Sequence, residues 1–443
     1  MDSYKDYFRG KKITVMGLGL LGRGLNDVKF LASCGAELIV TDLKTKDQLA
    51  RSLKQLGRFK RIRFVLGEHR LEDFQRRDMI LKAAGVPLDS PYIAEAERNG
   101  IPVEMDASLF ARLAGIPIIG VTGSKGKSTV THLIHHILKA ARRRVWLGGN
   151  VRGLATLPLI AKVRKGDIAL LELDSWQLQG FGGAGISPHI AVFTNFLEDH
   201  LNYYRGDMQA YFNDKAHIFR FQQEGDYLIA SPQAAAVIKK SSVDRRGKLI
   251  VASGKDIPSY WHLKLAGGHN QVNGALAIAA ARLVGVKEAM IKKALESFAG
   301  VKGRMEFVRE LKGIRYYNDT TATIPDSAIA ALRAFSGKKV ILLGGGADKN
   351  LEYAKFVKSL RGRIKALILF KGAASDKIVT LLPKRTAFPV KVAASMKEAM
   401  AKVKLQAARG DVVVLSPGAA SFGVFKNEFD RGDQFVRFVR RLR

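Results

Sequence analysis

The chain has 443 residues, of which 47% are hydrophobic and 26% are charged, and this length and composition indicate a folded protein of two or three domains. Lys and Arg total 73 against 40 acidic residues, so the formal net charge is +33, which attracts polyanions. The composition excludes a largely disordered chain, and the single cysteine, Cys34, excludes an intrachain disulfide.

The positive charge is scattered along the whole chain, and no nucleic-acid-binding motif accompanies it. We therefore expect anionic metabolites as partners and no specific nucleic acid, with incidental binding of nucleic acid at low salt. Residues 1–12 are charged, which predicts no signal peptide. No apolar run approaches the roughly 18 residues of a membrane span, so we expect a cytoplasmic protein without membrane contact.

Short β-branched runs alternate with helical patterns, which predicts an α/β fold with parallel sheets in three blocks. The predicted strands are 12–17, 37–42 and 61–67; then 116–123, 168–173, 190–195 and 249–253; then 314–319, 338–345, 365–370 and 411–418. An alanine-rich helix is expected around 273–284. We place the domains at 1–94, 95–299 and 300–443.

The first predicted strand leads into the motif Gly17-Leu-Gly19-Leu-Leu-Gly22, and Asp42 ends the next strand. This GxGxxG spacing favours a diphosphate at a helix N-terminus, with Asp42 bonding a ribose hydroxyl, as in an NAD-binding unit. A tight turn without a ligand, or a different diphosphate such as that of a UDP-sugar, fits equally. The local sequence leaves these alternatives open.

A second glycine-rich segment, residues 120–129, lies between a β-run and a helical pattern. It ends in GKST, although Val121 stands where the full phosphate-loop motif has glycine. Backbone N–H groups would surround the β-phosphate, Lys127 would reach the β- and γ-oxygens, and Ser128 would ligate Mg²⁺. The alternative is a chance glycine turn.

Two further candidates follow apolar strands downstream of this loop. Glu172 ends the run 168–173, where a carboxylate beside a phosphate loop suits Mg²⁺, although an ordinary surface glutamate is as good an explanation. His200 follows the run 190–195 and is a candidate ligand for a second metal, although a lone histidine is more often structural.

The motifs TGSKGKST, LELDSWQL, NFLEDHLNYY, GGHNQVN, YNDTTAT and LSPGAASFGVFKNEFDRG occur in the order found in Mur ligases, which the chain resembles over almost its entire length. The last motif and the first domain with GLGLLG resemble the D-glutamate-adding branch. The resemblance implies a Rossmann-like N-terminal domain that binds UDP, a central P-loop ATPase-like domain and a Rossmann-like C-terminal domain that binds the amino acid.

The implied activity is an ATP-dependent ligase that adds D-glutamate to UDP-N-acetylmuramoyl-L-alanine through an acyl phosphate, in peptidoglycan precursor synthesis, acting as a monomer. A carboxylate is a weak, anionic nucleophile, so cations must neutralise its approach to the phosphate. The alternatives are a Mur ligase that adds a different amino acid, a nicotinamide-dependent oxidoreductase that uses the GxGxxG motif, and a nucleic-acid-binding NTPase.

The resemblance assigns the nucleotide sites residue by residue. The UDP site takes Gly19, Leu20, Leu21 and Asp42, with a small-residue loop at 83–86. The ATP site takes Gly123, Ser124, Lys125, Gly126, Lys127, Ser128 and Thr129, with Asn270 and Asn273 at adenine and Arg304 and Asp319 reaching ATP from the C-terminal domain.

It also assigns the reacting groups and the amino-acid site. Two Mg²⁺ ions are implied, one at Ser128 and Glu172 and one near His200 and a carbamylated Lys215, with Asn150 near the reacting phosphate. D-Glutamate would contact Thr323, Lys349, Ser421 and the backbone near Glu428. Three positions depart from the family pattern, because Thr321 replaces a lysine, Gly303 a histidine and Glu428 an aromatic residue, and these departures loosen the amino-acid site assignment.

Overall fold

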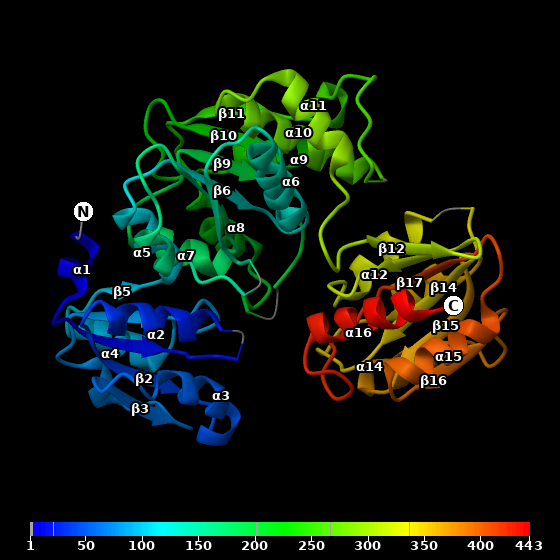
Figure 1. Cartoon of the computed structure of the whole chain (residues 1–443), viewed down its shortest axis with the longest axis horizontal. Coiled ribbons are helices and arrows are strands. Elements are labelled where there is room, and N and C mark those ends of the chain that lie inside the picture. Colours follow the sequence, from blue (N-terminus) through cyan, green and yellow to red (C-terminus); the bar gives the residue numbers. More distant parts are fainter. Residues whose placement is uncertain (1–2, 21, 152, 201–202, 266, 336) are drawn as a thin grey trace. The chain divides into compact units, whose positions relative to one another are not determined.

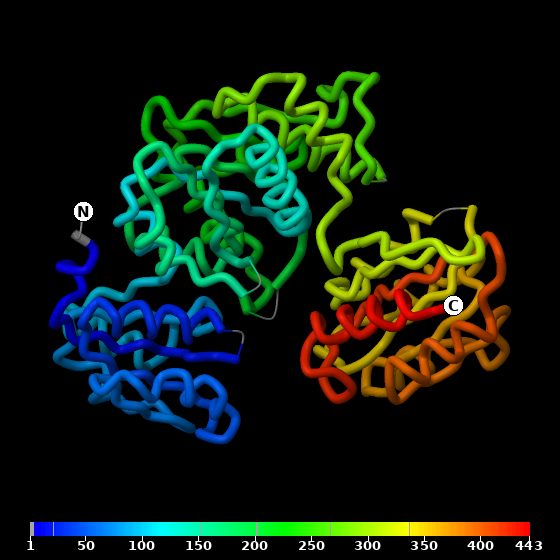
Figure 2. The backbone as a smooth tube through the Cα atoms, viewed as in Figure 1, coloured from blue at the N-terminus to red at the C-terminus, as the bar shows by residue number. Residues whose placement is uncertain are grey.

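The computed structural model describes residues 3–20, 22–151, 153–200, 203–265, 267–335 and 337–443 (Figure 1). The backbone forms two compact units (Figure 2). One runs to Leu263 and resumes over Gly268–Ser297, and the other holds Lys264–Gly267 and Phe298–Arg443. Within the described ranges, no helix has both the length and the apolar character needed to cross a bilayer.

The first unit begins with a parallel sheet in the order β3-β2-β1-β4-β5. Its strands are β1 (Lys12–Met16), β2 (Glu37–Asp42), β3 (Ile62–Leu66), β4 (Met79–Lys82) and β5 (Val103–Glu104), accompanied by α1 (Ser3–Phe8), α2 (Arg23–Ser33), α3 (Lys46–Leu56), η1 (Leu71–Phe74) and α4 (Pro91–Arg98). The three strands predicted here are confirmed. Because β5 pairs with β4, this sheet continues past residue 94, where we placed the end of the first domain.

A second parallel sheet follows in the same unit, in the order β11-β10-β9-β6-β8-β7. Its strands are β6 (Ile118–Thr122), β7 (Val145–Gly149), β8 (Ile168–Glu172), β9 (Ile190–Phe193), β10 (Tyr227–Ala230) and β11 (Lys248–Val251). Its helices are α5 (Asp106–Leu113), α6 (Lys127–Ala140), η2 (Leu157–Ala161), α7 (Ser175–Gly183), α8 (Met208–Ala216), α9 (Pro232–Lys240), η3 (Gly254–Asp256), α10 (Gly268–Leu283) and α11 (Glu288–Ser297). The central strand β6 is buried along its whole length, as a parallel strand covered on both faces should be.

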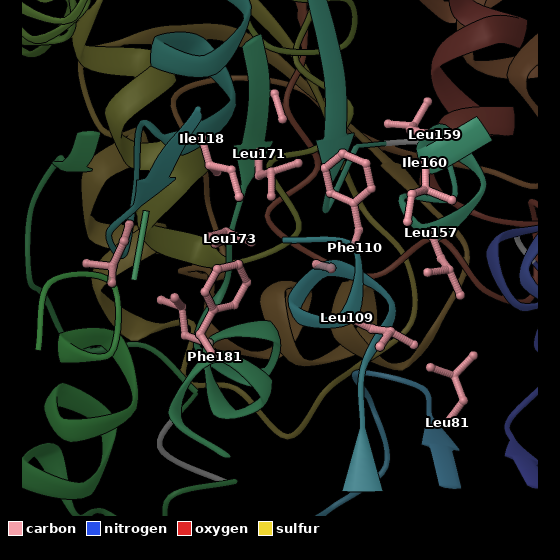
Figure 3. Packing of buried hydrophobic residues seen from close by; sticks show 14 of the residues in the cluster. Leu81, Leu109, Phe110, Ile118, Leu157, Leu159, Ile160, Leu171, Leu173 and Phe181 are labelled. Atoms are coloured by element: carbon pink, nitrogen blue, oxygen red, sulfur yellow. The ribbon is translucent and has the colours of Figure 1, made fainter. Parts of the chain in front are cut away.

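One apolar core joins the two sheets of the first unit. Figure 3 shows Leu109 and Phe110 of α5 between Leu171 of β8 and Leu81 of β4. Cys34, at the end of α2, belongs to the same core, and burial raises the pKa of its thiol to about 11. Because both sheets share this core, the same packed side chains hold the loops at the ends of both sheets in place.

The second unit holds a sheet in the order β12-β13-β17-β14-β15-β16, parallel except for the antiparallel pair β12 and β13. Its elements are β12 (Glu306–Leu311), β13 (Ile314–Asn318), α12 (Pro325–Arg333), β14 (Val340–Gly345), α13 (Ala354–Leu360), β15 (Ile364–Phe370), α14 (Ala373–Leu381), β16 (Val390–Ala393), α15 (Met396–Gln406), β17 (Val412–Leu415) and α16 (Glu428–Arg441). Residues of α15 and α16 pack into one core and those of α12, α13 and α14 into another, so helices cover both faces. The predicted α/β class is confirmed.

Candidate active site

A glycine-rich loop connects β6 to α6, and two of its glycines have conformations that other residues avoid. Gly123 has φ of 136°, and a Cβ there would lie 2.0 Å from Thr194 Oγ1. Gly126 has φ of 85°, and a Cβ there would lie 2.6 Å from Asn273 Oδ1. Both positions therefore require glycine, as a loop that closes around a phosphate does.

The loop is tied to the segment after β9. The Ser124 N–H donates to the Asn195 carbonyl at 2.9 Å, and the Lys125 N–H donates to Asn195 Oδ1 at 2.8 Å. Ser124 Oγ donates to the Leu197 carbonyl at 2.8 Å. These bonds attach Ser124 and Lys125 to the segment that follows β9. The first turn of α6, which begins at Lys127 and includes the half-buried Thr129, provides N–H groups that have no intrahelical acceptor.

The loop lysine bends back over the loop itself. Lys127 Nζ donates to the carbonyls of Gly123 at 2.8 Å and Ser124 at 3.1 Å. This ammonium is therefore held against the backbone of the loop.

Ser128 and Glu172 lie together at the carboxyl ends of β6 and β8, which are neighbours in the sheet. Ser128 Oγ donates to Glu172 Oε1 at 2.8 Å, and the Glu172 side chain is buried. A hydroxyl and a buried carboxylate form an oxygen donor set that suits Mg²⁺. The described residues contain no cluster of three or more His, Cys, Asp or Glu side chains that would form a complete protein metal site.

Asn150 follows β7 and lies next to Glu172, at the carboxyl end of β8. Its N–H donates to the Glu172 carbonyl at 2.6 Å, and its side-chain oxygen accepts a hydrogen bond from Arg23 at 3.2 Å. The structure thus brings Asn150 into contact with the backbone of Glu172 and with the first residue of α2.

Lys215 is fully buried in α8, and Nζ donates to the Gly123 carbonyl at 3.0 Å. Burial lowers the pKa of Lys215 well below its usual value, and the nearby Lys127 lowers it further. Its amine also lies 4.8 Å from the centre of the Tyr211 ring. The lowered pKa favours the uncharged form of this amine, which is the nucleophilic form.

His200 has a left-handed backbone, with φ of 55°, and its ring packs edge-on to Trp176 at 4.9 Å. Burial lowers the pKa of His200, while Asp199 opposes this effect. The imidazole is therefore neutral and able to accept a hydrogen bond or bind a cation through a ring nitrogen.

Several residues that the sequence analysis did not single out also line this region. Asp199 forms an ion pair with Lys125 at 3.1 Å. In the described structure, buried polar atoms of Trp176, Gln177 and Gln179 in α7 have no hydrogen-bond partner. The polar residues of the LELDSWQL segment, next to the apolar run that precedes it, are the pattern that could have indicated Trp176 and Gln177.

Asn270 and Asn273 lie in the first turns of α10, which packs against α6. Asn273 Nδ2 donates to Asn270 Oδ1 at 3.1 Å. Since Asn273 also lies against Gly126, the two amides border the phosphate-type loop at a position from which they could reach a base.

The turn after β1 is held by Asp42. Asp42 Oδ2 accepts from the Gly19 N–H at 2.8 Å, and Oδ1 accepts from the Lys44 N–H at 2.9 Å. The carboxylate therefore stabilises the turn itself, which the ribose-binding interpretation did not anticipate. Leu20 at the tip is 62% exposed, and Leu21 lies outside the described residues.

The small-residue loop predicted at 83–86 packs against this turn. The Ala83 N–H donates to the Met16 carbonyl, and a Cβ at Gly17 would lie 2.9 Å from Ala83 Cβ. The turn and the loop thus lie side by side at the carboxyl ends of β1 and β4, where the strand order of such a sheet reverses and ligands bind.

In the second unit, Asp319 follows β13 and is buried. Its oxygens accept hydrogen bonds from the Met305 N–H at 3.1 Å and from Ser416 Oγ at 2.8 Å. Burial raises the pKa of Asp319 to about 7, although these bonds and Arg304 oppose the rise. Thr321 Oγ1 donates to the Gly303 carbonyl at 2.9 Å, so this departure from the family pattern forms a local contact.

The residues predicted for D-glutamate gather at the carboxyl ends of the adjacent strands β13, β17 and β14. Lys349 Nζ lies 3.4 Å from Thr323 Oγ1. The Ser421 hydroxyl is buried and has no hydrogen-bond partner among the described residues. The Glu428 carbonyl accepts from Thr320 Oγ1 at 2.6 Å, so this acceptor is already used within the unit.

A buried arginine that the sequence analysis did not single out connects these loops through hydrogen bonds. Arg431 of α16 is fully buried and donates to Thr320 Oγ1 at 3.2 Å, to the Thr320 carbonyl at 2.9 Å and to the Ala419 carbonyl at 3.3 Å. Burial lowers its pKa to about 10. A Cβ at Gly432 would lie 2.5 Å from Thr320 Cγ2, so the FDRG motif permits this close approach of α16.

Known proteins are similar to this chain over almost its whole length. Three family models match it: the Mur ligase MurD-like N-terminal domain at residues 11–104, the Mur ligase middle domain at 121–245 and the Mur ligase glutamate ligase domain at 303–418.

Among relatives, the UDP-N-acetylmuramoylalanine–D-glutamate ligase of Roseiflexus sp. is 39% identical over 97% of this chain and 98% of that protein. The enzyme of the same name from Borreliella afzelii is 35% identical over 98% of each. Among solved structures, the MurC ligase of Thermotoga maritima covers 97% of this chain and 99% of its own, with a TM-score of 0.62 and 18% identity. MurF of the same organism, in complex with ADP, covers 98% and 95%, with a TM-score of 0.57 and 17% identity. These two structures support the fold.

Proposed function

The chain belongs to the Mur ligase family, and from that premise we propose that it is the ATP-dependent ligase that adds D-glutamate to UDP-N-acetylmuramoyl-L-alanine. The observation that carries this proposal is the loop between β6 and α6, with Lys127 folded over it and the Ser128–Glu172 pair beside it. Full-length similarity to D-glutamate ligases then selects the substrates. The relatives compared above are D-glutamate ligases, which favours this proposal over an oxidoreductase or a nucleic-acid-dependent NTPase.

The reaction joins two steps. The alanyl carboxylate of the acceptor attacks the γ-phosphorus of ATP, so that a C–O–P linkage forms and ADP leaves. The amine of D-glutamate, after losing a proton, attacks the acyl carbon and expels phosphate as the amide forms. In the first step an anion approaches a negatively charged phosphoryl group, and in the second step phosphate leaves as an anion, so positive charge at the loop lowers the barrier.

Lys127 supplies a fixed positive charge for the first step. Its two bonds to loop carbonyls hold Nζ at the mouth of the loop, so little reorganisation is needed when the β- and γ-phosphates enter. The amides Asn270 and Asn273 would orient the base, since an amide both donates to and accepts from a purine edge.

The Ser128 hydroxyl and the Glu172 carboxylate fit Mg²⁺, because they are adjacent oxygen donors at the strand ends beside the loop. When bound there, the ion would neutralise charge on the phosphate oxygens. For a second ion, His200 offers a neutral imidazole with a lowered pKa.

The lowered pKa of the buried Lys215 amine supports its carbamylation. CO₂ adds to an uncharged amine, an N–C bond forms and a proton is released, which leaves an anionic oxygen donor in place of the amine. The buried amine beside the Gly123 carbonyl has the lowered pKa that this reaction needs. We include a carbamate at Lys215 in the proposal for this reason.

In the second unit, Thr323, Lys349 and Ser421 are the donors proposed for the two carboxylates of D-glutamate. The buried, unpartnered Ser421 hydroxyl is the supporting observation, since a buried hydroxyl without a partner is costly unless a ligand supplies one. Arg304 and Asp319 are proposed for ATP. The proposal further places the enzyme in the cytoplasm, where its nucleotide-linked acceptor is available, and as a monomer, which light scattering would test.

A substrate panel tests the function. Phosphate release would be measured with ATP, Mg²⁺, UDP-N-acetylmuramoyl-L-alanine and one amino acid at a time, with a Lys127→Ala variant as the matched control. We expect D-glutamate to support turnover and L-glutamate, L-alanine and diamino acids to support little. If a different amino acid were far better than D-glutamate, the enzyme would be another Mur ligase and the D-glutamate assignment would be wrong.

A further inference from the structure

Arg23 is the first residue of α2, directly after Gly22 of the glycine-rich turn. Its guanidinium donates to Asn150 Oδ1 at 3.2 Å, and the Asn150 N–H donates to the Glu172 carbonyl at 2.6 Å. One side chain therefore connects the turn after β1 with the strand end that carries Glu172. The first sheet and the second sheet meet here through a polar contact as well as through their shared core.

Two buried carboxyl groups lie close enough to feel the charge of this guanidinium. Asp27 lies one turn further along α2 and is 4% exposed, and Asp106 begins α5 and is 7% exposed. Burial raises the pKa of both carboxyls, the charge of Asp106 raises that of Asp27 further, and Arg23 lowers both. The positive charge of Arg23 therefore favours the ionised form of both buried acids.

Asp106 also fixes the other end of the Asn150 segment. The Thr156 N–H donates to Asp106 Oδ2 at 3.4 Å, and Thr156 Oγ1 accepts from the Gly149 N–H at 2.9 Å. The backbone N–H groups of Gly149 and Asn150 are thus bonded in two directions, to Thr156 and to Glu172. The Asn150 side chain is itself exposed, and among the described contacts Arg23 is what orients it.

Two buried polar atoms of this cluster, Arg23 Nε and Asp27 Oδ1, have no hydrogen-bond partner among the described residues. Unpaired polar atoms are costly in a purely structural contact, and natural proteins retain them mainly where function requires it. Their presence here indicates that the cluster is arranged for something other than maximal stability.

We propose that Arg23 is a positioning residue for phosphoryl transfer, which holds the Asn150 amide beside Glu172 and links it to the turn that follows β1. The inference rests on the proposed function, because the orientation of Asn150 matters only if an acid is phosphorylated at this strand end. It adds that one side chain, Arg23, connects the turn at which the acceptor would bind with Asn150 beside the reacting phosphate.

A double-mutant cycle tests the inference, with Arg23→Met, Asn150→Ala and the combined variant. Acyl-phosphate formation would be measured without D-glutamate, by trapping with hydroxylamine, whose nitrogen displaces phosphate to give a hydroxamate. Each single change should lower kcat for this step about tenfold, the factor that corresponds to one oriented hydrogen bond. The combined variant should be no slower than Asn150→Ala, since Arg23 acts through Asn150.

Two more variants separate positioning from folding. Arg23→Lys keeps the charge and should recover part of kcat, and Arg51→Met, an exposed change on the neighbouring helix α3, should behave as the unchanged protein. KM for D-glutamate should stay constant throughout. The inference would be overturned if the two single effects multiplied in the combined variant, so that its kcat fell about a hundredfold. So would a rise in KM for the acceptor with kcat unchanged, which would make Arg23 a ligand of the acceptor.

The unchanged protein distinguishes this inference from the function on which it rests. If it forms no hydroxamate with ATP and UDP-N-acetylmuramoyl-L-alanine, the proposed function is wrong. If it forms hydroxamate normally and the cycle is additive, only the role of Arg23 is wrong.

Discussion

Replacing Gly126 by alanine perturbs the phosphate-type loop in a way whose size follows from the structure. The residue has φ of 85°, and a left-handed conformation costs alanine roughly 1–2 kcal/mol. The new Cβ would also lie 2.6 Å from Asn273 Oδ1, so the Asn273 amide must rotate and lose its 3.1 Å bond to Asn270. That loss adds about 1 kcal/mol, so we expect the free energy of unfolding to fall by roughly 2–3 kcal/mol.

Gly225→Ala is the matched control, because Gly225 has a similar φ of 94° but nothing within 4 Å of the added Cβ. It should lose only the conformational contribution, roughly 1–2 kcal/mol, and keep the KM for ATP. Gly126→Ala should raise the KM for ATP about tenfold, because Asn273 is proposed to bind adenine. Urea denaturation and steady-state kinetics measure the two quantities. Equal losses of stability in both variants, with an unchanged KM for ATP, would refute the role of the Gly126–Asn273 contact.

Three further results are expected. Lys127→Ala should lower hydroxamate formation at least a hundredfold while calorimetry shows acceptor binding nearly unchanged, and retained activity would refute the phosphate-loop assignment. Lys215→Ala should cripple turnover, with partial recovery on adding acetate, whereas full activity without an additive would exclude the carbamate. Asp319 has a pKa raised to about 7, so it binds its proton more tightly in the folded state, and its favourable contribution to stability at low pH is lost as the pH rises through 7. Asp319→Asn should therefore gain stability relative to the unchanged protein as the pH rises from about 4 to about 7 in thermal denaturation, and a constant difference across that range would contradict the buried carboxyl.

The sequence predicted β6 and β8, whose apolar runs are continuous because buried parallel strands need no alternation, but it did not predict the short buried strands β4 and β10. It did not predict β5, which is Val103–Glu104 alone and is defined only by its pairing with β4. It also did not predict β12, whose half-exposed residues and register shift between Phe307 and Arg309 produce no simple period. Such strands depend on partners distant in the sequence.

The candidate site was likewise predicted only in part. The GKST and GxGxxG spacings located both turns, since local backbone requirements are visible in glycine positions. The burial of Lys215 against the Gly123 carbonyl was not accessible, because composition alone favours an exposed lysine in so basic a chain. The role of Asp42 in holding the Gly19 turn was missed for a related reason, since a carboxylate at a strand end can serve the backbone or a ligand.

Arg431 illustrates a residue whose position only tertiary structure reveals. From the sequence it is one of many basic residues in the last helix, yet its neighbour Arg437 is exposed while Arg431 is fully buried. The difference arises because Gly432 allows α16 to approach Thr320, which places the guanidinium between two loops. Helical periodicity puts Arg431 on the face of Phe435 and Val439 and Arg437 on another face, but it does not show what the buried guanidinium contacts.

The buried thiol of Cys34 has a practical consequence. With a pKa raised to about 11 and a place in the apolar core, it carries almost no thiolate at neutral pH and should resist maleimide reagents. Because it is the single cysteine of the chain, two cysteines introduced at exposed sites, one per unit, would accept fluorophores selectively. Energy transfer between dyes at, for example, Arg51 and Arg361 would then report the separation of the two units in solution as each substrate is added.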